Sequence, residues 1–468
     1  MSLPTLVSGA AMTALTLWGM IGCAGVVQGI EVDLSSTQSI KDGAATLAYD
    51  MMSFYKGNQS GGIIGVLPGP PPNPPDGYYW WESGAMWGAM IDYWHYTGDE
   101  SYNDVVSTGI QAQVGENLDL MPRNWSQSMG NDDQGFWGLT AMSAAETNFT
   151  NPPSGSPGWL ALAQAVFNSQ SRRTDGECGG GLRWQVFPYL IGYDYKNSIA
   201  NGCFFNIAAR LARYTDNSTY YDHAVQTWDW ITSVGFIDKD YNVFDGGHIG
   251  HNCTDINRVQ FSYNIAIWLL GAANMYNYTN GSSIWEDRVN LLLNSTFNTF
   301  FPNDIAYEVA CEPKLTCSID MFSFKSYVMR WLAATSMVAP FTRDRIMPKL
   351  RKSAQAAAAQ CTGGATGRTC GLSWSSGVYD GTVGVGQQMA AMSALFVNIL
   401  PLQEVPPPLT NNTGGTSVGN PDAGARSVTD LRMLLPPSEQ DKAGAAVITA
   451  VWVAASVVLF GWMSVGES

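Results

Sequence analysis

The sequence predicts an all-α fold in which six helical hairpins close into an (α/α)6 barrel. Helical segments that begin with small or polar residues recur six times between residues 30 and 401. The equivalent positions are Trp87, Trp137, Phe204, Asn264, Phe324 and Gln388, which gives steps of 50, 67, 60, 60 and 64 residues. Each step is long enough for one helical hairpin, and a period of this kind is typical of repeat architectures.

The segments at 84–90, 135–142, 201–208, 263–268, 322–331 and 386–396 are the expected inner helices. Similar turns at 96–102, 214–220 and 278–283 close hairpins, and amphipathic outer helices are expected at 221–231 and 285–293. An open helical solenoid is the alternative. An even count of six, without obvious capping repeats, favours the closed barrel. Its site is then expected in the loops that precede the inner helices.

The two ends of the chain predict export and a lipid anchor. Residues 1–29 are expected to be a signal peptide, and 30–401 to be the catalytic barrel. Residues 402–442 are expected to be a flexible, polar and Pro-rich linker that contains a glycosylphosphatidylinositol (GPI) attachment region at 419–425. Residues 443–468 are apolar and lack a basic flank, so a removed C-terminal GPI signal is favoured over a retained transmembrane helix.

Sequons and cysteines also indicate the secretory pathway. Nine Asn-x-Ser/Thr sites are present, at Asn58, Asn124, Asn148, Asn217, Asn252, Asn277, Asn280, Asn294 and Asn411. The expected disulfides are Cys311–Cys317, Cys361–Cys370 and Cys178–Cys253. Cys203 lies in an apolar run, which predicts a buried free thiol.

Composition excludes some functions. The formal net charge is −15, so no basic surface is available for nucleic acid. Seventeen Trp residues suit a large core and also stacking on neutral sugars. A metal site at His248, His251 and Cys253 is disfavoured, because the spacing is not a standard one and Cys253 is expected to form a disulfide. We expect neither a metal nor a cofactor.

The most informative stretch is NDDQGFWG at 131–138, which contains the adjacent acids Asp132 and Asp133. Neighbouring carboxylates push each other's pKa values apart, which suits a glycosidase that needs one ionised and one protonated carboxyl group. The alternative is a helix N-terminus at which both acids favour the helix dipole.

Aromatic and polar residues recur before the other expected inner helices. Such residues supply stacking surfaces and hydrogen bonds for a polyhydroxylated ligand, although helix capping explains some of them. The candidate substrate-binding residues are Tyr79, Trp80, Trp81, Glu82, Asn131, Gln134, Arg183, Trp184, Asp194, Lys196, Asn197, Gln260, Tyr263, Asn264, Asp320 and Lys325.

Four motifs together resemble the fungal GPI-anchored members of glycoside hydrolase family 76: YWWESGAMW at 79–87, NDDQGFWG at 131–138, GGLRWQ at 180–185 and GYDYKN at 192–197. The resemblance runs from about 34 to 401, although the Pro-rich insert at 61–75 is longer than expected. It implies an (α/α)6 barrel and a retaining mechanism, with Asp132 as nucleophile and Asp133 as acid/base. It also implies a place at the outer face of the plasma membrane and in the cell wall.

For the fungal branch, the resemblance implies cleavage of the mannose-containing glycan of a GPI anchor and transfer of the attached protein to wall β-glucan. The alternatives are hydrolysis of α-1,6-linked wall mannan and a non-catalytic, lectin-like wall scaffold. The presence of both aspartates argues against the scaffold. We expect a monomer that is held to the membrane by the GPI lipid.

Overall fold

The structure is a computed structural model that describes residues 29–72, 74, 76–425 and 439–465. The expected signal peptide therefore lies outside the described residues, apart from Gly29. The three disulfides predicted from the sequence are confirmed: Cys178–Cys253, Cys311–Cys317 and Cys361–Cys370.

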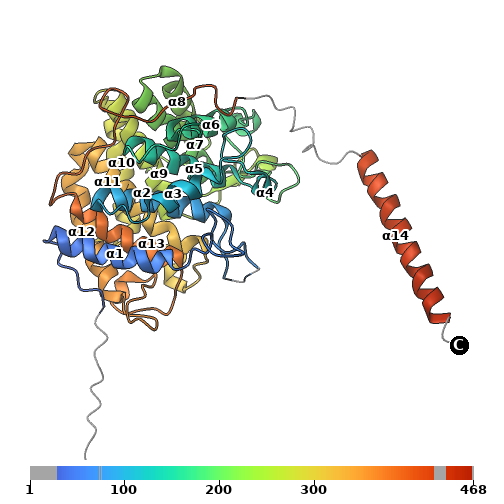
Figure 1. The fold of residues 1–468 in the computed structure, drawn as a ribbon. Coiled ribbons are helices and arrows are strands. Elements are labelled where there is room, and N and C mark those ends of the chain that lie inside the picture. The colour runs from blue at the N-terminus through green and yellow to red at the C-terminus, as the bar shows by residue number, and fades with distance from the viewer. Residues whose placement is uncertain (1–28, 73, 75, 426–438, 466–468) are drawn as a thin grey trace, which may run out of the picture.

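Six inner helices form a closed ring, which confirms the predicted barrel (Figure 1). Each inner helix packs against the next, and the last packs against the first. The inner helices are α2 (Trp80–Thr97), α5 (Asn131–Glu146), α7 (Ser198–Thr215), α9 (Ser262–Tyr278), α11 (Phe324–Val338) and α13 (Val385–Phe396). Nearly every residue of α7 and α13 is buried, as expected for helices enclosed on all sides.

Outer helices cover this ring. They are α1 (Thr37–Met52), α3 (Asn103–Gln111), α6 (Trp159–Ser171), α8 (Ser218–Ser233), α10 (Ser283–Phe300) and α12 (Arg343–Gln360). Helix α10 shows the amphipathic pattern: it buries Trp285, Val289 and Leu292 against the ring and exposes Leu291. Helix α1 packs against α13, so the first helix completes the last hairpin.

Small residues allow the inner helices to approach closely. A Cβ added at Gly135 of α5 would lie 2.5 Å from Cβ of Cys203 on α7, and one at Gly138 would lie 2.9 Å from Cδ1 of Ile207. Cys203 is buried and unpaired, which confirms that prediction. The small residues that mark the repeat in the sequence therefore serve helix packing.

All six long loops lie at one end of the barrel, where the inner helices begin; we call this the cleft end. Each leads from an outer helix to the next inner helix, and they span 53–79, 112–130, 172–197, 234–261, 301–323 and 361–384. The turns at the opposite end are shorter: they range from two residues at 216–217, between α7 and α8, to twelve at 147–158, between α5 and α6.

The remaining described elements are short, apart from one C-terminal helix. Strands β1 (Tyr195–Asn197) and β2 (Gly246–His248) pair antiparallel at the cleft end, near helix α4 (Arg123–Ser126). The 3-10 helices are η1 (Glu177–Gly179), η2 (Ile249–His251), η3 (Pro302–Asp304), η4 (Glu312–Lys314), η5 (Asp320–Ser323), η6 (Pro340–Thr342), η7 (Trp374–Ser376) and η8 (Val397–Ile399).

Residues 405–425, which we call the C-terminal strap, lie along the barrel and differ from the flexible linker expected there. The N–H of Leu409 donates to the carbonyl of Glu146, and the N–H of Asn420 donates to Oε1 of Gln164. The side chain of Asn168 on α6 donates to the strap carbonyls of Pro421 and Ala423. Polar side chains on the outer helices therefore hold a segment whose own composition suggests disorder.

Helix α14 (Glu439–Val465) is drawn apart from the barrel (Figure 1). Its residues 442–460 are apolar enough to cross a membrane, by length and composition, and none of this window is buried in the protein. It contains much of the segment expected to be the GPI signal.

Candidate active site

Asp132 and Asp133 lie in the first turn of α5 and both line one cavity at the cleft end. The N–H of Gly130 donates a 2.7 Å hydrogen bond to Oδ2 of Asp133, so this side chain also caps the helix. The N–H of Asp133 donates a 3.0 Å hydrogen bond to Oδ1 of Asp132. The capping function and a place in the cavity therefore coexist at this pair.

The cavity has a volume of about 610 Å³. Seven of the candidate substrate-binding residues line it together with the two aspartates: Tyr79, Trp80, Trp81, Trp184, Asn197, Tyr263 and Asp320. They come from five different loop-and-helix junctions, because each inner helix begins at this end. The barrel topology thus brings residues far apart in sequence to one place.

Aromatic rings form much of the wall and are held in place by neighbouring rings. Trp80 stacks on Trp137 with ring centroids 4.9 Å apart, and Tyr263 stacks on Phe324 at 3.8 Å. The indole N–H of Trp80 also donates to Oε1 of Gln113 at 2.9 Å. Rigid rings of this kind suit stacking on the apolar face of a sugar.

Nine candidate residues do not line the cavity: Glu82, Asn131, Gln134, Arg183, Asp194, Lys196, Gln260, Asn264 and Lys325. Several of them contact other protein groups instead. Gln134 donates to the carbonyl of Asp119, and buried Lys325 pairs with Glu312 at 2.7 Å. A direct contact between these residues and a sugar remains a prediction.

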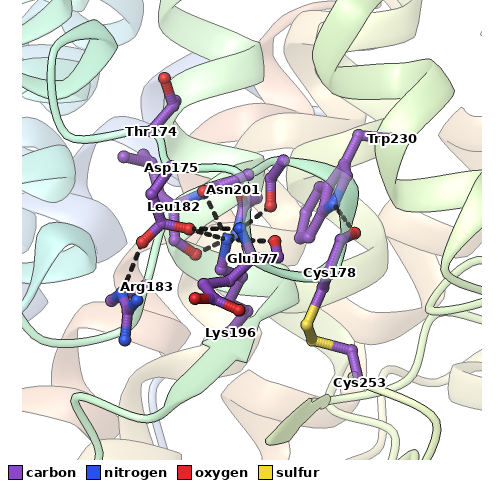
Figure 2. Close-up of polar contacts among 12 residues, drawn as sticks. Thr174, Asp175, Glu177, Cys178, Leu182, Arg183, Lys196, Asn201, Trp230 and Cys253 are labelled. Atoms are coloured by element: carbon purple, nitrogen blue, oxygen red, sulfur yellow. Dashed lines mark hydrogen bonds and ion pairs between the residues drawn. A yellow bond between two sulfur atoms is a disulfide. The ribbon is translucent and has the colours of Figure 1, made fainter. Parts of the chain in front are cut away.

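Lys196 is the clearest example of a candidate residue that contacts protein groups and not the cavity. Its ammonium group is buried behind the cavity wall and bound by protein oxygen atoms (Figure 2). Its Nζ donates to Oδ1 of Asp175 at 2.7 Å and to the carbonyls of Glu177, Gly180 and Gly181. Arg183 binds the other oxygen of Asp175 at 2.6 Å. Side chains alternate along a strand, so Lys196 points away from the cavity while its neighbours on β1 face it.

Lys196 binds the loop that contains Cys178. The disulfide Cys178–Cys253 links this loop with the segment that follows β2 (Figure 2). The indole of Trp230 donates to the carbonyl of Cys178 at 3.1 Å. The two-stranded sheet is therefore braced from behind by an ion pair, a disulfide and a tryptophan.

The sequence analysis missed several lining residues. Asp245 precedes β2 and accepts a 2.7 Å hydrogen bond from the hydroxyl of Tyr195. Gln185 and Tyr195 belong to the motifs at 180–185 and 192–197, which resemble family 76. Pro70 and Pro71 belong to the Pro-rich insert at 61–75, which therefore forms part of the cavity wall. The other additional lining residues are Trp125, Ser128, Met129, Phe136, Ile199 and Phe324.

Burial opposes ionisation of the acids in and beside the cavity. It raises the pKa of Asp132 to about 7, although hydrogen bonds from backbone N–H groups and from the Asn197 side chain hold that pKa down. Burial and the charge of Asp132 raise the pKa of Asp133 well above its usual range. Burial also raises the pKa of Asp320 to about 6. Both carboxyl groups therefore resist ionisation, and their mutual repulsion favours a state in which only one of them is charged.

An (α/α)6 barrel with two raised-pKa carboxyl groups in an aromatic cavity has the features of a glycoside hydrolase. The chain belongs to glycosyl hydrolase family 76, whose family model matches residues 39–412. This finding confirms the resemblance seen in the motifs, and the protein is accordingly a glycoside hydrolase.

Two curated relatives illustrate the match. The mannan endo-1,6-alpha-mannosidase DCW1 of Saccharomyces cerevisiae is 44% identical over 438 residues, which cover 93% of this chain and 95% of the relative. A putative mannan endo-1,6-alpha-mannosidase of Schizosaccharomyces pombe is 45% identical over 400 residues, which cover 85% of this chain and 88% of the relative.

Solved structures share the fold. Dfg5 from Chaetomium thermophilum, solved in complex with glucosamine, is 52% identical and has a TM-score of 0.83, covering 86% of this chain and 99% of that one. An inactive variant of the alpha-1,6-mannanase GH76A of Salegentibacter, in complex with alpha-1,6-mannotetrose, is 16% identical with a TM-score of 0.62, covering 79% of this chain and 99% of that one.

Proposed function

We propose that the protein is a retaining enzyme that cleaves α-1,6-linked mannose, with Asp132 as nucleophile and Asp133 as acid/base. The observation that carries this proposal is the geometry of the site: two adjacent aspartates line one aromatic cavity, and burial raises the pKa of both. The assignment of the two roles follows the family resemblance. The names of the curated relatives, which are mannan endo-1,6-alpha-mannosidases, support the substrate.

In the first step, a carboxylate oxygen of Asp132 attacks the anomeric carbon while the glycosidic C–O bond breaks. Asp133 gives its proton to the departing oxygen, so a mannosyl ester and a free hydroxyl result. In the second step, Asp133 takes the proton of the acceptor hydroxyl, which displaces Asp132 from the sugar. Retention requires the two carboxyl groups to lie about 5 to 5.5 Å apart around the bound sugar.

The rings of Tyr79, Trp81, Trp184 and Tyr263 are the surfaces on which we expect mannose units to stack. Asn197, Asp320 and Asp245 supply hydrogen-bonding groups to sugar hydroxyls in the same cavity. Flat rings with a few polar groups suit a chain of neutral sugars, and we expect several sugar units of one chain to bind at the same time.

The charge of the cavity supports a GPI glycan as the donor. Its described lining contains Asp132, Asp133, Asp245 and Asp320 and none of the cationic residue types. A protonated amine is favoured in such a site, so a glycan that carries an amino sugar beside mannose fits it. The related Dfg5 structure contains glucosamine, which agrees with this choice.

Transfer of the cleaved mannosyl group to wall β-glucan is the second part of the proposal. The same ester reacts with water in a simple mannan hydrolase, so the acceptor alone separates the two functions. We propose a position at the outer face of the plasma membrane and in the cell wall. Three disulfides and the apolar segment of α14 support export and membrane attachment.

Product analysis tests the function. The protein is incubated with alpha-1,6-mannotetrose or a mannosylated GPI glycan, with and without β-glucan oligosaccharides, and the products are followed by mass spectrometry and by NMR of the anomeric proton. New glucan-linked products with the α configuration would support transfer. Release of free mannosides with the α configuration would indicate hydrolysis, and an inverted product would exclude the retaining mechanism.

Binding without turnover would instead indicate the lectin-like scaffold. The Asp133→Asn variant separates these outcomes further, because a donor with a leaving group that needs no proton should restore part of its first step. A scaffold shows no such rescue.

A further inference from the structure

Exposed apolar side chains gather at the cleft end of the barrel. Outside α14, the structure describes fifteen exposed large apolar residues, and ten of them belong to the long loops that precede inner helices. The ten are Ile63, Ile64, Tyr79, Trp184, Tyr189, Ile191, Val259, Leu315, Val378 and Val383. The other five, Tyr49, Ile284, Leu291, Leu402 and Val418, are scattered over outer helices and the C-terminal segment.

This distribution is unusual for loops in contact with water. Ile191 is 95% exposed at the tip of the loop before β1, and Leu315 is 82% exposed in the loop before α11. Single exposed apolar residues are ordinary, but a gathering at one end indicates an interaction surface. Tyr79 and Trp184 also line the cavity, so this surface is continuous with the cleft.

The C-terminal strap provides an independent observation, because it leads the chain toward the same end. It begins at the opposite end, where the N–H of Leu409 binds the carbonyl of Glu146, the last residue of α5. It then follows α6 in order: Oγ of Ser417 accepts from the N–H of Leu160, and Asn168 binds the carbonyls of Pro421 and Ala423.

The strap ends beside the last turns of α6, where Arg172 binds the carbonyl of Gly424. The neighbouring Arg173 contacts Gln134 in the first turn of α5, one residue after the aspartate pair. Figure 1 shows the strap crossing the barrel toward the side on which α4 lies. The chain that continues to the apolar C-terminal segment therefore leaves the barrel at the cleft end.

The strap fixes where either kind of anchor begins. A GPI lipid attached at 419–425, as the sequence predicts, starts beside Asn168 and Arg172 at the end of α6. If α14 is retained instead, the length of the connection limits how far it lies from the cleft. Thirteen residues, 426–438, separate the strap from α14. A fully extended chain of that length spans at most about 45 Å. Without the strap, the chain would leave the barrel near residue 405, at the end opposite the cleft. The membrane anchor would then begin at that opposite end.

We propose that the cleft end is a membrane-facing surface, and that its apolar loops contact the bilayer to which the C-terminal segment attaches the protein. The cleft then opens toward glycans that are linked to lipids in the same membrane, a geometry that rests on the proposed function. The net charge of −15 repels anionic lipids, so the contact is apolar and depends little on salt.

Quenching by lipids tests the surface. The full-length protein, in which α14 serves as the anchor in place of the GPI lipid, is inserted through this helix into phosphatidylcholine vesicles that contain brominated lipid. It carries an environment-sensitive fluorophore on either Ile191→Cys or Ile284→Cys. The described barrel cysteines are paired or buried, so they compete little for the label. Ile284 lies on α10 and is 61% exposed, which makes it a matched control.

We expect quenching of the label at position 191 and none at position 284, with little change between low and high salt. Equal quenching, no quenching, or quenching at position 284 alone would overturn the proposal. Removing the strap contact with Asn168→Ala and Arg172→Ala should reduce the quenching at position 191, because the anchor is then free to swing away from the cleft end.

A kinetic comparison separates this proposal from the proposed function. Replacement of both Ile63 and Ile191 by Ser should lower turnover of a lipid-anchored α-1,6-mannoside in vesicles by about tenfold, the effect of losing partial burial of two side chains. Turnover of soluble alpha-1,6-mannotetrose should not change. If the parent protein cleaves neither substrate, the proposed function fails, while the quenching result still decides the orientation. Equal loss on both substrates would contradict the membrane contact.

Discussion

Asp132 and Asp133 lie in the cavity, and burial makes the ionisation of each side chain unfavourable in free energy. Burial raises the pKa of Asp132 to about 7, and burial together with the charge of Asp132 raises the pKa of Asp133 well above its usual range. Between the unfolded pKa of about 4 and these folded values, the folded state holds more protons than the unfolded state. Stability therefore falls as the pH rises through this window.

Replacing either acid by its amide should remove that penalty. We expect Asp132→Asn to abolish turnover and to raise the free energy of unfolding at pH 7 by roughly 2 kcal/mol. The gain should vanish at pH 4, where the wild-type carboxyl group is protonated in the folded state. Calorimetry at the two pH values measures this effect, and a variant that is destabilised at pH 7 would show that Asp132 has a supporting role in the fold.

Asn197 should affect the pKa of Asp132, the proposed nucleophile. Its side chain lowers the pKa of Asp132 through a hydrogen bond, and its Oδ1 accepts from the N–H of Ala200 at the start of α7. We expect Asn197→Ala to move the acidic limb of the kcat/KM profile to higher pH, because Asp132 then ionises less readily. Asn197→Asp keeps the cap and adds a negative charge, so it should shift the limb in the same direction. An unchanged acidic limb in both variants would separate Asn197 from Asp132.

At the scale of the element, strand β1 faces the cavity with Tyr195 and Asn197 and is fixed from behind by Lys196. The lysine is fully buried, and four oxygen atoms surround its Nζ. Its positive charge compensates Asp175 and satisfies three carbonyl groups of a tight Gly-rich loop. The precision of this part of the cavity thus depends on a group that does not line it.

We expect Lys196→Met to destabilise the fold by about 3 kcal/mol, because the carbonyls of Gly180 and Gly181 lose the lysine as their donor and Asp175 keeps only Arg183 as a cationic partner. The exposed pair Lys239–Asp240 provides the control, and Lys239→Met should leave the melting temperature unchanged. Urea unfolding of both variants makes the comparison. Equal stability of the two would contradict the role assigned to the buried lysine.

Helix positions could be predicted from the sequence better than side-chain directions. Small residues at Gly135 and Gly138 predict inner helices because close packing excludes larger ones. The same reasoning cannot tell that the side chains of Lys196 and Lys325 are buried, since a lysine near the start of an inner helix can bind either a ligand or a protein carboxylate. Asp245 escaped notice because its Tyr195 partner is fifty residues away and no local pattern joins them.

The strap escaped prediction for a similar physical reason. Its own residues are small and polar and suggest disorder, but the groups that hold it lie on α5, α6 and α7. A segment that is ordered by distant partners leaves no periodic signal in its own sequence. The aspartate pair, in contrast, could be found because both chemistry and position are encoded in adjacent residues.

For the whole molecule, the strap covers α6 and holds the chain that leads to the apolar C-terminal segment. We expect Asn168→Ala to lower the free energy of unfolding by about 1 to 2 kcal/mol, since two strap carbonyls lose their donor. It should also speed proteolysis within 405–425. Asn412→Ala, an exposed substitution in the same strap, serves as control. Cleavage at equal rates in both variants would show that Asn168 does not hold the strap.

Trapping of the covalent intermediate tests the central claim most directly. The protein is incubated with an activated 5-fluoro-mannoside, which slows breakdown of the ester, and its peptides are then analysed by mass spectrometry. The account predicts one added sugar on the peptide that contains 131–138, located at Asp132, and no adduct in the Asp132→Asn variant. An adduct on Asp133 or Asp320, or an active enzyme that forms no adduct, would contradict it.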